Sequence, residues 1–371
     1  MIELVEVTNL KRFLTASVPL GRLNLLTGLN GTGKSTFVQA LLLAKQAAGI
    51  GRSGVVALND VHGLALGEAQ EVLHPLAEEP AIVLGLRCDD GEVGIRFDVP
   101  AKRSLNLPFT TDTDLPASLS GASGRLFCYL NAERLGPRDQ LAMTSGDVED
   151  LGVGVRGEYT AQVLAAHEST RVDRDVLHPE TDSEVNRGVK TLRTQVELWA
   201  SEIIRPVEIT ASWRPGLSAS TIRFREPGLF GSEIRPGNTG FGFSYALPII
   251  VAGLRMRPGS LFIVENPEAH LHPAGQSRMG RFLARLARFG VQVVVETHSD
   301  HVLNGVRLAV VEGVSVGHAD VLTYFFGERS GDGPTPIRMN AKGSLESWPE
   351  GFFDQIEHDL GRLSRAGRRQ R

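Results

Sequence analysis

One stretch of the chain has the residue types and spacing of a phosphate-binding loop. Residues 28–35 read Gly-Leu-Asn-Gly-Thr-Gly-Lys-Ser, which fits the pattern G-x-x-x-x-G-K-[ST]. Glycines let backbone N–H groups converge on an anion, and a helix N-terminus favours negative charge. In such a loop the Lys34 ammonium reaches the terminal phosphates and the Ser35 hydroxyl binds Mg²⁺. The spacing therefore predicts a site for Mg²⁺ and a nucleoside triphosphate.

The neighbours of this loop favour the same interpretation. Residues 22–27 predict a short buried strand, and residues 36–48 have the pattern of a helix. This order distinguishes a phosphate site from the alternative, a chance glycine turn before an ordinary helix. We expect the following residues to contact the nucleotide: Asn30, Gly31, Thr32, Gly33, Lys34, Ser35 and Thr36.

A carboxylate for the metal is expected at the end of a second buried strand. Residues 261–264 are four apolar residues, and Glu265 follows them directly. Ligands of open α/β sheets bind at the carboxyl ends of strands. We therefore predict that Glu265 lies beside Ser35 and the Mg²⁺, directly or through water. The alternative is a structural glutamate at a strand end.

A third strand, residues 291–295, ends in a second polar cluster, Glu296-Thr-His-Ser-Asp-His301. His298 is placed to donate a hydrogen bond to a γ-phosphate, and its alternative is an ordinary helix-start residue beside Asp300. His270, His272, His298 and His301 could also form a metal cluster. That interpretation is disfavoured, because the H-x-H pair lacks a second ligand group at a recognised zinc spacing.

Residues 238–250 supply a further anion site. A small-residue turn is predicted to put Ser244 at the start of an apolar helix, where N–H donors suit a phosphate. The alternative role of Ser244 is a plain N-cap.

The elements that must position these residues are those of an α/β chain. Strand and helix alternate over residues 261–310, which implies a right-handed parallel crossover. Val185, Val189, Leu192, Val196, Trp199 and Ile203 form one apolar helical stripe, with a cap at Asp182 or Ser183. Residues 49–67 are expected to be mostly loop, and residues 102–123 to be loop or an ordered insertion. Further strands are predicted at residues 1–7, 81–87, 93–99, 124–130, 207–213 and 220–224, and residues 10–20 lead from the first of these to the strand before the phosphate loop.

These segments, in this order, resemble the ABC-type ATPase heads, and more closely the OLD-like group related to the RecF and chromosome-maintenance (SMC) ATPases. The blocks N-T-G-F-G-F-S, V-E-N-P-E-A-H-L-H-P and E-T-H-S-D-H are similar to those of a poorly characterised bacterial set of OLD-like ATPases. Residues 129–137 and 347–355 resemble further segments of that set.

The resemblance implies an α/β fold of the P-loop, ABC-type head class. A mixed or parallel sheet would be flanked by helices and would carry an inserted β-hairpin and a helical middle region. The implied division is a discontinuous core of residues 1–50 and 235–326, an insertion of residues 51–234, and a C-terminal extension of residues 327–371 with a basic tail.

The resemblance also assigns roles. Residues 28–35 correspond to Walker A, Glu265 to the Walker B acid, His298 to the switch histidine, and Ser244 with Gly240 and Gly242 to the signature motif. ATP would then lie between two heads in a head-to-tail dimer. Lys11, Arg12 and Phe13 are candidates to contact the base or the phosphates.

One position departs from that pattern. The general base usually follows the metal acid directly, and Asn266 occupies this position. An amide orients water but does not accept its proton. Glu268 or Glu296 could substitute, or hydrolysis is slow and nucleotide acts mainly as a binding switch.

Net charge, cysteine content and the lengths of apolar runs limit the possible partners and the compartment of the protein. The 371 residues carry a net charge of −4, so there is no global basic signal for nucleic acid. Arg134, Arg138 and Arg156 could still meet DNA phosphates or act as ion-pair formers or phosphate sensors. A tail with Arg362, Arg365, Arg368, Arg369 and Arg371 could do so too, or be solvated and disordered. Two cysteines, no visible signal sequence and no long apolar run predict a cytoplasmic protein.

The expected function is an ATP-driven dimerisation switch that controls DNA engagement or a partner effector, in defence against phages and plasmids or in DNA repair. The alternative is a nucleotide-dependent binding module with little hydrolysis. A transporter-driving ATPase is disfavoured, because no membrane-coupling segment is recognisable. The residues after His301 contain no clustered D-x-D acids, so any nuclease would be a partner.

Overall fold

The computed structural model describes residues 1–60, 63–121, 124–183, 188–213, 218–228, 233–327 and 333–369, without the side chains of residues 367–369. The strands are β1 Ile2–Leu10, β2 Phe13–Pro19, β3 Leu23–Gly28, β4 Ser53–Ala57, β5 Ala81–Cys88, β6 Gly91–Asp98, β7 Asn106–Thr111, β8 Phe127–Leu130, β9 Leu141–Ala142, β10 Glu208–Trp213, β11 Ala219–Arg225, β12 Leu261–Glu265, β13 Gln292–Glu296, β14 Val321–Phe326 and β15 Thr335–Arg338. The α-helices are α1 Lys34–Ile50, α2 Ala69–Val72, α3 Ala117–Ser120, α4 Thr160–His167, α5 Leu192–Ile203, α6 Phe241–Arg255, α7 Pro273–Phe289, α8 Asp300–Val311 and α9 Gln355–Arg369.

A central sheet positions the predicted site. Its strand order is β15-β14-β3-β13-β12-β8. All neighbouring pairs are parallel except β14 with β15. The carboxyl ends of β3, β13, β12 and β8 therefore lie along one edge of the sheet, in that order. The phosphate loop follows β3, and Glu296 and Glu265 end the next two strands.

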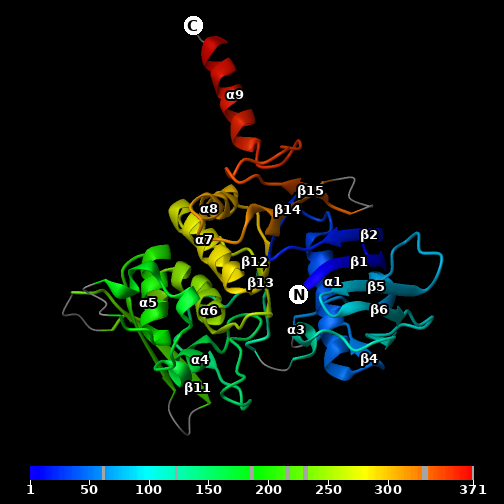
Figure 1. Ribbon diagram of the computed structural model, residues 1–371, viewed down its shortest axis with the longest axis horizontal. Coiled ribbons are helices and arrows are strands. Elements are labelled where there is room, and N and C mark those ends of the chain that lie inside the picture. Colours follow the sequence, from blue (N-terminus) through cyan, green and yellow to red (C-terminus); the bar gives the residue numbers. More distant parts are fainter. Residues whose placement is uncertain are drawn as a thin grey trace.

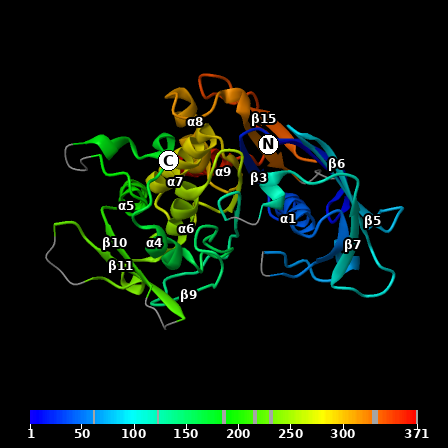
Figure 2. The ribbon, with the colours of Figure 1, turned by 60° about the horizontal axis from the view of Figure 1, so that its bottom comes forward.

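Both faces of this sheet are covered, which explains why its strands are apolar runs and not alternating patterns. Leu261 and Ile263 belong to one core, together with α1 and the strands around it. Phe262 and Val264 belong to a second core with α5, α6 and α7. Figures 1 and 2 show the helices α5–α7 on one side of the central strands and α1 on the other.

A second sheet, of antiparallel strands, covers α1. Its order is β2-β1-β5-β6-β7-β4. Alternate residues of β5 (Ile82, Leu84 and Leu86) are buried in the same core as Phe37 and Leu41 of α1. The helix that leaves the phosphate loop is thus held between two sheets. A smaller sheet, β10-β11-β9, lies beside α4.

Many predicted elements are present. The phosphate-loop strand, the strand–helix–strand–helix unit of residues 261–311 and the hairpin of β5 and β6 all form, with Asp89 and Asp90 in the hairpin turn. Cys88 and Cys128 are both buried free thiols.

Several boundaries were wrong. The predicted stripe helix starts at Leu192 and not near Ser183, because Gly188 has φ +69° and the Lys190 carbonyl accepts from Val172 N–H. Val189, placed in the stripe, is 42% exposed, and Val185 lies outside the described residues. β4 occupies a segment that was predicted as mostly loop, and β7 and α3 lie in the segment that was predicted as loop or an ordered insertion.

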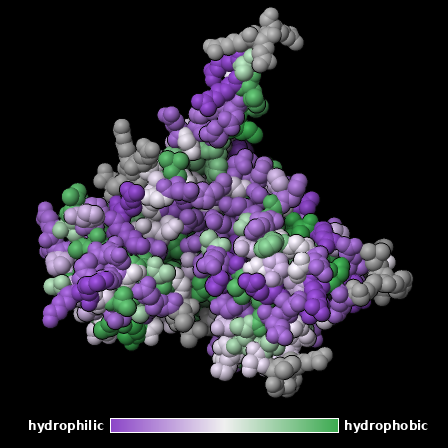
Figure 3. Space-filling model, turned by 180° about the vertical axis from the view of Figure 1, so that it is seen from behind, coloured by the Kyte–Doolittle hydropathy of each residue, from purple (hydrophilic) through white to green (hydrophobic). Residues whose placement is uncertain are grey.

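The basic tail is helical and not disordered along α9. Figure 1 shows this helix projecting from the body of the molecule, and Figure 3 shows hydrophobic residues among the hydrophilic ones along it. Arg362 and Arg365 are exposed, whereas Arg371 lies outside the described residues.

The sheets cross the predicted domain boundaries. β1 and β2, predicted in the core segment, join the antiparallel sheet, while β8 of the insertion and β15 of the extension join the central sheet. The predicted core, insertion and extension are therefore segments of the sequence that do not coincide with separate sheets. Within the described residues, no helix is long and apolar enough to span a bilayer.

Candidate functional site

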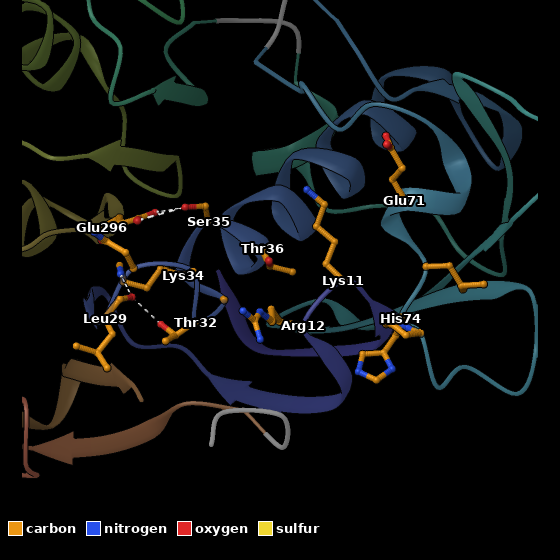
Figure 4. Close-up of a pocket in the computed structure, with 15 residues that line it drawn as sticks. Lys11, Arg12, Leu29, Thr32, Lys34, Ser35, Thr36, Glu71, His74 and Glu296 are labelled. Atoms are coloured by element: carbon orange, nitrogen blue, oxygen red, sulfur yellow. Dashed lines mark hydrogen bonds between the residues drawn. The ribbon is translucent and has the colours of Figure 1, made fainter. Parts of the chain in front are cut away.

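The phosphate loop borders a large open cavity at the carboxyl edge of the central sheet. The cavity has a volume of about 1030 Å³, and Figure 4 shows side chains of the loop, Glu296 and the segment around His74 on its walls. Two loop glycines are required by the geometry. Gly28 has φ +124° and a Cβ there would meet the Phe326 carbonyl oxygen at 2.2 Å; Gly33 has φ +121° and a Cβ would meet the Phe13 ring at 2.8 Å.

Lys34 and Ser35 begin α1 inside this cavity. The Lys34 side chain is buried, and its Nζ donates to the carbonyls of Gly28 (2.9 Å) and Leu29 (2.7 Å). Burial lowers the pKa of Lys34, and the nearby Glu296 opposes this shift. A cation is thus fixed at the point where the pattern places terminal phosphates.

Glu296 is the carboxylate that contacts the loop. It ends β13, the strand next to β3, and its two oxygens accept from Ser35 Oγ at 3.3 and 3.2 Å. A hydroxyl and a carboxylate are the hard oxygen ligands that Mg²⁺ prefers, so these residues fit that ion. Burial and the neighbouring Glu265 raise the pKa of Glu296 to about 7.

Glu265, the predicted metal acid, ends β12, one strand further from the loop. Its carboxylate accepts from Tyr129 Oη (2.9 Å) and from Ala132 N–H (3.0 Å). Burial raises its pKa, and the two hydrogen bonds oppose this shift. Glu265 is not among the residues that line the loop cavity, but its charge acts on Glu296. Its part at the metal therefore stays a prediction.

The raised pKa of Glu296 gives a pH-dependent stability. Its folded-state pKa of about 7 exceeds the ordinary 4.5, so the native state holds more protons than the unfolded state between these values. The free energy of unfolding should fall by roughly 3 kcal/mol as the pH rises through that window. Urea unfolding of the metal-free protein at pH 5 and pH 8 measures this. Glu296→Gln should make the drop smaller, with Glu265, whose pKa is also raised, as a remaining source; an equal drop in both proteins would contradict the assignment.

Asn266, at the expected position of the general base, has a strained backbone with φ +46°. Its N–H donates to the Glu296 carbonyl at 2.8 Å, which ties the ends of β12 and β13 together. Its Oδ1 is buried without a hydrogen-bond partner among the described residues. An unpaired acceptor of this kind is free for a donor such as a bound water.

Glu268 and His298 meet at the same edge. The Glu268 carboxylate accepts from Thr297 Oγ1 (2.7 Å) and from His298 N–H (2.8 Å). The His298 side chain is exposed, and desolvation together with nearby Lys34 lowers its pKa. The structure thus brings Glu268, Glu296 and His298 to one edge of the sheet with the loop.

Ser244 and Gly242 lie elsewhere. Helix α6 begins at Phe241 with Gly240 as N-cap, so Ser244 lies in the first turn of the helix, as predicted, and is not its N-cap. A Cβ at Gly242 would meet the His270 carbonyl oxygen at 3.2 Å, so this turn packs on the loop after β12. Neither residue lines the phosphate cavity.

Of the predicted base contacts, Lys11 and Arg12 line the cavity, and Phe13 packs under Gly33. Glu71, Leu73, His74 and Pro75 line it too, and sequence reasoning missed them. These residues lie far along the chain from the phosphate loop, so no local pattern predicts that they meet it. The bridge between Leu10 and Leu73 brings them to the cavity. Within the described residues, no group of three or more His, Cys, Asp or Glu side chains forms a metal cluster.

The sequence leaves three roles open for Arg134: contact with DNA phosphates, an ion pair, or a phosphate sensor. Its side chain is 2% exposed and donates to the carbonyls of Asn131 (2.9 Å), Glu265 (2.6 Å) and Asn266 (2.6 Å). It forms no ion pair in the described part of the chain. Arg134 therefore fixes the backbone where β8 and β12 end.

Comparisons with known proteins bear on this arrangement. Residues 167–304 match a family model described as "AAA domain, putative AbiEii toxin, Type IV TA system". Residues 316–363 match one described as "Protein of unknown function (DUF3696)". Neither match includes the phosphate loop. No curated protein matches the sequence.

Solved structures are similar over nearly the whole chain. One is an SMC head bound to the C-terminal winged-helix domain of ScpA, with a TM-score of 0.54 and 12% identity; the similarity covers 91% of this chain and 97% of that one. Another is the Pyrococcus furiosus SMC head with an extended coiled coil, bound to the C-terminal domain of ScpA. Its TM-score is 0.53 at 12% identity, over 98% of this chain and 99% of that one. The chain thus has the α/β fold of the SMC heads, which are ABC-type P-loop ATPases, and carries an AAA ATPase domain match over residues 167–304.

Proposed function

We propose that this protein binds and hydrolyses Mg-ATP and that the nucleotide switches it between open heads and a closed dimer. One observation carries the proposal: the Ser35 hydroxyl of a glycine-rich loop touches the Glu296 carboxylate of the neighbouring strand, beside the buried Lys34. This is the arrangement that a metal-bound triphosphate requires.

The proposed site has residues that bind the phosphates and residues that bind the metal. The backbone N–H groups of Gly31 to Ser35 and the Lys34 ammonium bind the phosphates, and Thr36 and Asn30 border them. Ser35 and Glu296 would hold Mg²⁺. Glu265, one strand further from the loop, would bind the ion directly or through water. When bound, Mg²⁺ neutralises charge on the phosphates. His298 would donate to the γ-phosphate.

Water must then lose a proton to a nearby base. Glu296, with a pKa near 7, and Glu268, fixed by Thr297 and His298, are the carboxylates at this edge besides Glu265. The Asn266 Oδ1 is free to orient the water. Phosphoryl transfer depends mostly on positioning and charge, so turnover survives without a strong base.

The start of α6 would supply the second half of each site in the proposed dimer. Ser244, Gly242 and the start of α6 lie outside the phosphate cavity, so they would serve the nucleotide of a second copy. The output would be DNA engagement or control of a partner effector, and the ScpA domains bound to the similar SMC heads illustrate the second kind of output.

An OLD-like ATPase of phage or plasmid defence, acting in the cytoplasm, is the biological setting that we favour over DNA repair. The AbiEii toxin and toxin–antitoxin system in the description of the matched family support defence. The two free thiols suit a reducing compartment.

Light scattering of Glu265→Gln with and without Mg-ATP tests the switch. Slow hydrolysis in this variant should trap the dimer and double the mass. An unchanged mass with saturating nucleotide would contradict the switch.

A second candidate, a nucleotide-dependent binding module with little hydrolysis, is favoured by Asn266. We predict that Asn266→Glu raises single-turnover hydrolysis by at least about tenfold, because a carboxylate accepts the proton of water where an amide does not. Rapid-quench measurement with Asn266→Asp as the matched shorter acid checks this. A fall in both variants would mean that Asn266 already suits the catalytic step.

A further inference from the structure

A second cavity lies at the same edge of the central sheet, beyond β8. Its volume is about 540 Å³, and its walls include Arg134, Arg138, Arg156, Phe241 and Tyr245. Three guanidinium groups and two aromatic rings are the chemistry that recognises a phosphate ester attached to a planar base.

The three arginines are not equivalent. Arg134 is buried, donates to backbone carbonyls, and packs over the Tyr245 ring at 5.4 Å; its Nε has no partner in the part of the chain that the structure describes. Arg156 is paired with Glu133 at 2.8 Å. Arg138 is exposed, and within the described residues it has no hydrogen bond or ion pair. Arg138 is therefore the cation of this cavity that is available for a ligand.

Arg138 does not border the phosphate-loop cavity of its own chain. β3, β13, β12 and β8 are consecutive neighbours, so the end of β8 lies three strand spacings, about 14 Å, from the loop. Arg138 follows β8, and it is not among the residues that line the loop cavity.

The neighbouring surface is suited to a second copy of the chain. Phe241 is 50% exposed at the start of α6, a helix whose first N–H groups have no side-chain cap. His270 stacks on Phe241 at 4.9 Å and fixes this helix start to the loop that follows Glu265. The cavity and the phosphate loop thus share one edge of one sheet, and a two-fold axis across that edge would place each against the other.

We propose that Arg138 acts in trans and binds the phosphates of the ATP that the phosphate loop of a second copy holds. This inference rests on the proposed function. A guanidinium there adds bidentate hydrogen bonds and positive charge to the γ-phosphoryl group, while Lys34 supplies charge from the other side. Each chain then contributes its loop to one site and Arg138 to the other.

The first test compares Arg138→Ala with Arg96→Ala, an exposed arginine of the antiparallel sheet paired with Glu79 and Asp98. ATP binding at low protein concentration, followed with a fluorescent ATP analogue, should stay within about twofold in both variants, because the loop is intact. Turnover should fall at least about thirtyfold in Arg138→Ala only. Unchanged turnover in Arg138→Ala would overturn the proposal, and so would a loss confined to DNA binding.

Mixing separates action in trans from action in cis. Lys34→Ala lacks the loop cation and Arg138→Ala lacks the trans arginine, so each is expected to be nearly inactive alone. Random pairing of equal amounts makes half of the dimers mixed, each with one complete site, so turnover should recover to about a quarter of the wild-type value. No gain on mixing would overturn the proposal. Wild-type protein without ATP turnover or ATP-dependent association would instead reject the proposed function itself.

Discussion

Replacing Lys34 with alanine is expected to lower ATP turnover at least about a hundredfold, because it removes the charged donor aimed at the terminal phosphates. Within the described residues, Lys34 Nζ donates to the backbone carbonyls of Gly28 and Leu29 and to no side chain. Equilibrium ATP binding and steady-state hydrolysis measure the effect.

The control for this variant is Lys342→Ala, which removes an exposed lysine in the turn after β15. It should leave both quantities unchanged. Thermal unfolding of both variants checks that a loss of turnover is not a loss of the fold. Turnover within a few-fold of the wild type would exclude the loop as the ATP site.

Glu296→Gln is expected to lower turnover by about a hundredfold and to abolish the gain in ATP affinity on adding Mg²⁺, since an amide neither carries the charge nor binds the ion as well. Glu265→Gln should lower turnover comparably but keep most of the Mg²⁺-dependent affinity, because Ser35 and Glu296 remain. ATP titrations with Mg²⁺ and with EDTA separate the two variants.

An exposed carboxylate provides the matched control for this pair. Glu92 forms an ion pair with Arg87 on the surface of the antiparallel sheet, and Glu92→Gln should behave as the wild type. If Glu265→Gln loses the Mg²⁺ effect and Glu296→Gln keeps it, the metal belongs to Glu265, as the sequence pattern alone suggests.

The residues that could be predicted from the sequence are those whose neighbours in the chain decide their conformation. The glycine-rich loop, its strand and its helix follow from one continuous run, and so do the apolar strands that end in Glu265 and Glu296. Parallel pairing then brings the ends of these strands to one edge, as expected.

What could not be predicted depends on contacts between distant segments. The order of β3, β13 and β12 puts Glu296 next to Ser35, with Glu265 a strand further away, and no local pattern encodes that order. The strand β14 pairs with β3 in the central sheet, yet its residues belong to none of the sequence motifs described above. Arg134 illustrates the same limit, since its carbonyl partners come from the ends of two strands.

A structure of the protein with Mg²⁺ and a non-hydrolysable ATP analogue tests the central claim most directly. The account predicts the triphosphate in the loop of residues 28–35, Lys34 on its terminal phosphates, and Mg²⁺ bound by Ser35 on the side of Glu296. A triphosphate bound away from the loop, or Mg²⁺ that contacts neither Ser35 nor the two carboxylates, would contradict it.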